Sequence, residues 1–92
     1  MTEYKLKTPI ILGEETVEVL KLEEPTIEKL KKFNVDLSQE ALELSEGMFR
    51  IICACVTNVS EAHVNKMKMR DMVRCMKECV GFFSEGAKEA PQ

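Results

Sequence analysis

The chain has 92 residues, of which 45% are hydrophobic and 5% aromatic, and it carries a formal net charge of −3. This length allows one domain, whose thin core must rest on Leu, Ile, Val and Met. The acidic balance argues against a general nucleic-acid binder and against a protein that adheres to anionic membranes, because both need a basic surface. With no apolar stretch of about 18 residues and no signal-peptide core, the chain is expected to act in the cytoplasm.

The first predicted element is a two-stranded antiparallel β-hairpin over residues 3–23. Apolar residues alternate and then run together in residues 3–12, and apolar residues of both parities follow in residues 16–23. Gly13 lies between the two stretches and suits a tight turn. The mixed parity at Val19 and Leu20 predicts either a bulge there or a sheet that is covered on both faces.

Two helices are predicted next. Thr26 follows Pro25 and is placed to cap a short helix over residues 27–33. Asp36 or Ser38 is available to cap a second helix, which extends over about residues 39–56. The second helix is the most apolar part of the chain and is expected to be central. Its stripe consists of Leu44, Met48, Ile51, Ile52, Cys55 and Val59, with Phe49 and Cys53 beside it.

The C-terminal half is also predicted to be helical. One turn is expected at residues 61–65, and a last helix over residues 69–84 has one methionine-rich side and one basic side. The predicted fold class is therefore α+β and mainly helical, with a hairpin followed by three to four α-helices. One domain is expected over residues 1–86, with its helical part at residues 26–84, and residues 87–92 are expected to form a disordered tail.

The four cysteines are the sharpest candidates for chemistry. Cys53 and Cys55 lie two positions apart, which places them about 200° apart around a helix, so they cannot both face one metal ion unless the helix breaks. Cys75 and Cys79 share a helix face, but two ligands are too few. Buried structural thiols are the favoured interpretation, and no cofactor is expected.

No catalytic arrangement is evident, so the chain is not expected to be an enzyme. His63 is the only histidine, and it lies in a polar turn where a surface or capping role is favoured. The serines lack the sequence context of a nucleophile elbow.

The methionines suggest a surface that binds another protein. Four of the six lie within residues 67–76, and methionine side chains adapt to irregular apolar partners. For Met67 and Met69, core and interface are left as alternatives, and Met48 and Phe49 are either core or rim. The candidate partner-binding residues are Met67, Met69, Met72, Met76, Phe82, Phe83, Met48 and Phe49.

The order of features over about residues 4–84 resembles the Mu-like and P2-like phage tail assembly chaperones. The residues that carry the likeness in the first half are Leu6, Pro9, Ile10, Gly13, Val17, Leu20, Leu22, the run Glu24-Pro25-Thr26-Ile27, and Leu30. In the second half they are the segments VSEAHVNKM and MRDM and the closing Gly81-Phe82-Phe83.

This resemblance implies a non-catalytic assembly protein encoded by a phage or prophage. Such a protein binds the long helical tape measure protein, keeps it soluble, and helps to recruit tail tube subunits, and it is absent from the finished virion. Self-association through an open hairpin edge is a further expectation. The alternative is a small metal- or nucleic-acid-binding regulator that uses the four thiols and the basic helix side, and a structural protein with another partner is a third possibility.

Overall fold

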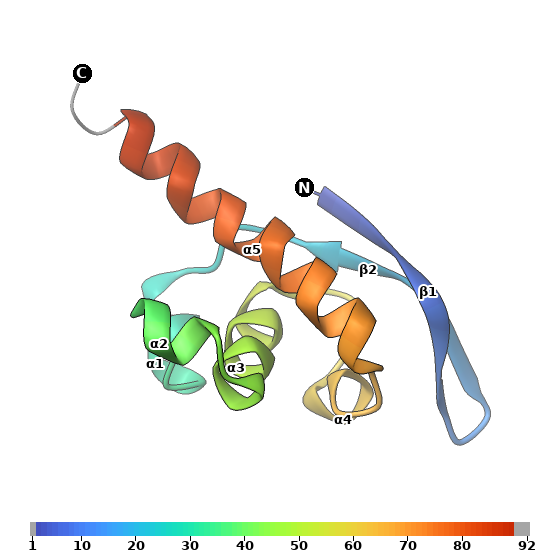
Figure 1. Cartoon of the computed structure of the whole chain (residues 1–92). Helices are drawn as coiled ribbons and strands as arrows, with labels where there is room; N and C mark the ends of the chain where they lie inside the picture. The colour runs from blue at the N-terminus through green and yellow to red at the C-terminus, as the bar shows by residue number, and fades with distance from the viewer. Residues whose placement is uncertain (1, 90–92) are drawn as a thin grey trace.

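The computed structural model describes residues 2–89 and confirms the α+β class, with an N-terminal two-stranded sheet followed by helices (Figure 1). Five helices lie within the described residues, one or two more than expected from the sequence. The elements are β1 (Thr2–Leu12), β2 (Glu15–Leu22), α1 (Ile27–Lys32), α2 (Gln39–Leu42), α3 (Ser45–Cys55), α4 (Glu61–Val64) and α5 (Met69–Glu89).

The hairpin closes through the expected glycine turn, in which Gly13 has a φ of 62°. The strands pair regularly near the turn and again near the start of β1, but residues 6–9 of β1 stand opposite Glu18 alone. The irregularity therefore lies on β1, and the bulge considered at Val19 and Leu20 of β2 is wrong. Leu20 is fully buried and Val19 half-buried, so both faces of β2 are covered, as the other alternative required.

Asp71 of α5 holds the bulged part of β1. This side chain is only 1% exposed. Its carboxylate accepts hydrogen bonds from the backbone N–H of Lys7 at 2.9 Å, the backbone N–H of Thr8 at 3.0 Å and the hydroxyl of Tyr4 at 2.8 Å. A bulge leaves backbone donors without a partner on the neighbouring strand, and a buried donor must find one elsewhere. Asp71 supplies it and thereby joins the hairpin to the last helix.

These contacts change how both acidic groups titrate. Burial by itself works to raise the pKa of Asp71, but the N–H donors of Lys7 and Thr8, the Tyr4 hydroxyl and the charge of Arg74 outweigh it and hold that pKa below its usual range. Burial and the hydrogen bond to Asp71 raise the pKa of Tyr4 to about 12. At neutral pH, therefore, Asp71 stays ionised and Tyr4 keeps the proton that it donates.

The outer edge of β2 is covered by the connector between α3 and α4. Val56 forms a β-bridge with Leu22, and Thr57 donates its backbone N–H to the carbonyl of Lys21 at 2.9 Å. The side chain of Asn58 extends the pairing, because it accepts from the N–H of Lys21 at 2.9 Å and donates to the carbonyl of Val19 at 3.0 Å. The hairpin edge that the sequence predicted to be open is therefore covered at residues 19–23, along the end of β2 and just past it.

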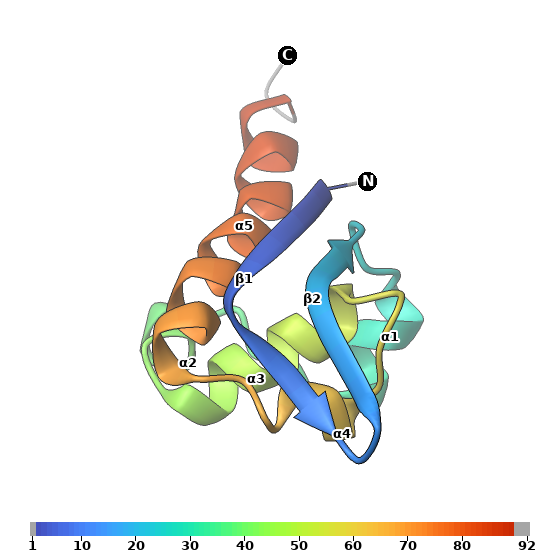
Figure 2. The ribbon, with the colours of Figure 1, turned by 90° about the vertical axis from the view of Figure 1, so that its right-hand side faces the viewer.

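The core lies between the hairpin and the helices α3 and α5. Figure 2 shows α3 between α5 on one side and α1 on the other. The hairpin contributes Leu6, Ile10, Leu20 and Leu22, and the helical part contributes Ile51, Ile52, Cys53, Cys55, Val56, Val64, Met67, Cys75 and Cys79.

The central helix is shorter than predicted, because the segment 39–56 breaks into α2 and α3. Leu44 is extended, with φ −95° and ψ 144°, and its side chain is 63% exposed instead of joining the apolar stripe. The break folds α2 back onto α3, where the carbonyl of Ala41 comes so close to Gly47 that an added Cβ would overlap it. Gly47 thus marks close packing, as predicted, but between two short helices. Ser38 caps α2 by accepting from the N–H of Ala41 at 3.2 Å.

The last helix is longer than predicted and ends at Glu89. Residues 87–89, which were expected to belong to a disordered tail, are part of α5, and residues 90–92 lie outside the described residues. Within residues 2–89, none of the helices combines the length and the apolar character that crossing a membrane requires.

The Asp71 contacts generate a stability prediction. Asp71→Asn should lower the free energy of unfolding by about 2–3 kcal/mol, because the amide NH₂ group faces N–H donors and leaves buried groups unpaired. Urea unfolding followed by circular dichroism measures the change. Glu78→Gln, an exposed position on the same helix, is the matched control and should shift stability by less than about 0.5 kcal/mol. Equal stability of Asp71→Asn and the parent chain would contradict this role of the carboxylate.

The lowered pKa of Asp71 also predicts a pH dependence. A carboxyl whose pKa is lowered by folding stabilises the fold fully above its unfolded pKa, near 3.9, and loses that contribution as the pH falls through the lower folded pKa. The stability difference between the parent chain and Asp71→Asn should therefore shrink as the pH is lowered from about 6 to about 3. Urea unfolding at several pH values measures it, and a constant difference would contradict the prediction.

Two glycines provide a matched pair. Gly47→Ala should destabilise the fold by about 1–3 kcal/mol, because the new methyl group collides with the Ala41 carbonyl. Gly81→Ala lies inside α5, where an added Cβ meets nothing within 4 Å, and should stabilise by up to about 1 kcal/mol through helix propensity. Thermal unfolding of both variants checks the signs. A stabilising Gly47→Ala would show that α2 does not pack on α3 as described.

Candidate protein-binding surface

Helix α5 buries one line of side chains and half-covers the next. Asp71, Cys75 and Cys79 follow one another at four-residue spacing and are all buried. A neighbouring line, which we call the methionine face, lies about 100° further around the helix axis, because most of its residues directly follow a residue of the buried line. The methionine face consists of Met69, Met72, Met76, Val80 and Phe83. Sequence periodicity selected this second line as the apolar side, because Asp71 made the truly buried line look polar.

The C-terminal half of α5 begins against the core and then extends beyond the other elements. Figures 1 and 2 both show α5 extending past α3 and the hairpin toward the C-terminus. The described chain is accordingly elongated, with extents of 47 × 24 × 24 Å. Val80, Phe82 and Phe83 lie at the start of this projecting half and are only partly buried. The helix therefore presents apolar side chains that its own fold does not fully cover.

The residues that the sequence singled out divide into three groups. Met48 and Met67 are 9% and 8% exposed and belong to the core, so neither is available to a partner in this structure. Met69 is 57% exposed and so does not belong to the core, and its place in an interface stays a prediction. Those that are partly buried against the core are Phe49, Met72, Met76, Phe82 and Phe83.

The thiols are core side chains. Cys55, Cys75 and Cys79 are fully buried where α3 packs on α5, and Cys53 is 4% exposed. Burial, with the nearby charge of Glu61, raises the pKa of Cys53 to about 12, and contact with the Cys55 and Cys75 thiols together with burial raises the pKa of Cys79. Among the side chains that the structure describes, those of residues 2–83, no three His, Cys, Asp or Glu residues are placed to hold a metal ion. The metal-binding alternative gains no support from this arrangement.

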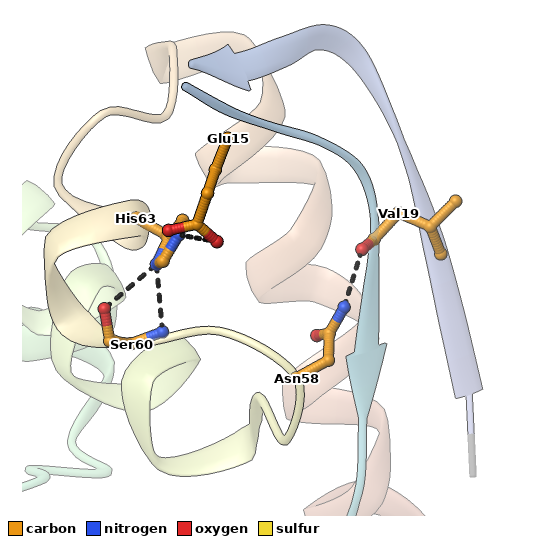
Figure 3. A network of polar contacts seen from close by, with 5 residues as sticks. All are labelled: Glu15, Val19, Asn58, Ser60 and His63. Atoms are coloured by element: carbon orange, nitrogen blue, oxygen red, sulfur yellow. Dashed lines mark hydrogen bonds and ion pairs between the residues drawn. The ribbon is translucent and has the colours of Figure 1, made fainter. Parts of the chain in front are cut away.

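His63 caps α4, as one of the two favoured roles proposed, but it is buried. Figure 3 shows its ring between Ser60 and Glu15. Nδ1 accepts from the backbone N–H of Ser60 at 3.2 Å and lies 2.9 Å from the Ser60 hydroxyl, which is the reciprocal pairing of a capping box. Because Nδ1 is the acceptor, the neutral ring carries its proton on Nε2. Nε2 makes no hydrogen bond but lies 3.5 Å from the exposed carboxylate of Glu15 at the hairpin tip.

These polar contacts hold the hairpin against the segment around α4. Figure 3 also shows the Asn58 amide reaching the Val19 carbonyl, so the hairpin is tied near its turn and again along β2. Ser, His and Glu side chains also form the catalytic groups of many hydrolases. In this protein the Ser60 hydroxyl is part of the cap of α4 and lies on the same helical turn as the His63 ring. The sequence did not predict the contact with Glu15, because 48 positions separate it from His63.

Comparison with known proteins places the chain near phage assembly proteins. A family model described as phage tail assembly chaperone proteins, E, or 41 or 14, matches residues 3–84. The match includes the hairpin, all of α1 to α4 and most of α5. Neither the curated proteins nor the solved structures yielded a match.

Proposed function

Because the chain belongs to the family of phage tail assembly chaperones, we propose that it binds a phage tape measure protein and keeps it soluble during tail assembly. The protein acts by binding alone, without catalysis, in the cytoplasm of the bacterial host. It helps to recruit tail tube subunits around the tape measure protein and is left out of the finished virion.

The observation that carries this proposal is the half-covered methionine face on a projecting helix. A helix with an uncovered apolar line can pack against an amphipathic helix of another chain. Methionine makes that packing tolerant of sequence, because its unbranched side chain fills irregular gaps. The proposed contact residues are Met69, Met72, Met76, Val80, Phe82 and Phe83, with Phe49 at the rim.

The methionine face is presented without unfolding. The buried line of α5 is fixed to β1 through Asp71 and to α3 through Cys75 and Cys79, which are fully buried. The partner therefore meets a helix that is already ordered, and the entropic cost of forming that helix is not part of binding. Met48 and Met67 contribute from the core, as support for the helix instead of as contacts.

Co-expression with the cognate tape measure protein tests the proposal. The parent chain should increase the soluble yield of the tape measure protein and elute with it in size exclusion. Met69→Glu combined with Phe83→Glu should weaken the complex by about tenfold or more, since buried apolar anchors dominate such interfaces.

Ile27→Glu is the matched control, because Ile27 is 67% exposed on α1, on the other side of the molecule, and should leave the complex intact. Circular dichroism of each variant separates lost binding from lost folding. The absence of any complex with the parent chain would overturn the function. A folded double variant that binds normally would leave the function standing and move the contact surface away from the methionine face.

A further inference from the structure

A groove lies on the opposite side of α3 from α5. Its volume is about 590 Å³, and it runs between α1 and the connector that leads into α4. In Figure 2, α1 and this connector lie together on the side away from α5, so the groove is separate from the methionine face. The lining residues are Lys29, Lys32, Phe33, Cys53, Val56, Thr57, Val59, Ser60, Glu61 and Ala62.

The floor of the groove is formed by apolar side chains. Cys53 and Val56 come from the buried end of α3, and Phe33 and Val59 pack against the core from either side. The ammonium group of Lys32 lies 5.3 Å from the centroid of the Phe33 ring, a distance that allows a cation–π attraction. The groove therefore offers both apolar and polar contacts to a side chain of a partner.

The rim on the α1 side is positive, whereas the chain as a whole has a net charge of −3. Lys29 and Lys32 both line the groove. Among the side chains of residues 2–83, the ion pairs are Arg50 with Glu46 and His63 with Glu15, and neither involves a lysine of the rim. Glu61 is the one acidic residue of the lining. The rim therefore favours an anionic group, and the floor beneath it favours an apolar one.

We propose that this groove is a second docking site, which takes an acidic amphipathic helix of the protein partner, with an apolar side chain on the floor and a neighbouring carboxylate on Lys29 and Lys32. The inference rests on the proposed function for the identity of the partner as a helical protein. It adds the charge of the segment that binds and a site on the face opposite α5. The methionine face is uncharged along its length and carries no such preference.

A pair of model peptides tests the charge preference on the full chain. The probe is a labelled helical peptide of about 18 residues made of Leu, Ala and Glu, long enough to hold a helix on binding, and its partner has Lys in place of every Glu. Fluorescence anisotropy should show that the parent chain binds the Glu peptide at least about tenfold more tightly than the Lys peptide, with a difference that shrinks as salt is added.

Variants place that preference in the groove. Lys29→Glu with Lys32→Glu should reverse it, so that the Lys peptide becomes the tighter ligand. Lys5→Glu with Lys31→Glu, at two exposed positions outside the groove, changes the net charge by the same amount and should keep the preference for the Glu peptide. Ala62→Trp fills the groove without a charge change and should weaken binding of the Glu peptide by about tenfold or more.

Equal binding of the two peptides, or an unaltered preference after the Lys29 and Lys32 reversal, would overturn the inference. Displacement of the Glu peptide by a single-stranded oligonucleotide at comparable concentration would also overturn it, because the positive rim would then bind phosphate groups instead of carboxylates. These outcomes are distinct from failure of the proposed function, which is measured by the complex with the tape measure protein. That complex can persist through the methionine face when the groove binds nothing.

Discussion

The carboxylate of Asp71 is the group on which the rest of the arrangement depends. A two-stranded hairpin is not stable by itself in water and must pack on something larger. Here its first strand is interrupted by a bulge, which leaves the N–H groups of Lys7 and Thr8 without a partner on β2. One buried carboxylate on α5 satisfies both, together with the Tyr4 hydroxyl, and so joins residues more than 60 positions apart. The orientation of the last helix relative to the sheet follows from this contact.

A framework fixed in this way has two faces that its own side chains leave incomplete. On one side α5 exposes part of the methionine face, and on the other the groove between α1 and α4 has an apolar floor under a positive rim. The connector after α3 links the sheet to the groove, because Val56 pairs with β2 and also lines the groove. If both proposed surfaces bind segments of one partner protein, the second contact forms at a high effective concentration.

Local signals in the sequence were sufficient for the hairpin and for most helix starts. Thr26 caps the helix that it was expected to cap, Ser38 is the one of the two candidates that caps α2, and Gly13 turns the hairpin. What the sequence could not reveal depended on contacts between distant residues. Leu44 has the spacing of a core residue, yet the break before α3 exposes it. Because Asp71 is charged, it was not predicted to be a buried residue, although its hydrogen-bond partners from β1 make its burial favourable. The groove is built from segments around Phe33 and Val59 that approach only in the folded chain.

The covering of β2 by Val56, Thr57 and Asn58 has a consequence for how copies of the protein meet one another. A hairpin whose two edges are both open can add strands from further copies without limit and so form a fibre. In this hairpin the outer edge of β2 is covered by its own chain at residues 19–23, and on the other strand two central amides are already engaged by Asp71. Both features limit the places at which one copy of the hairpin can add a strand to another.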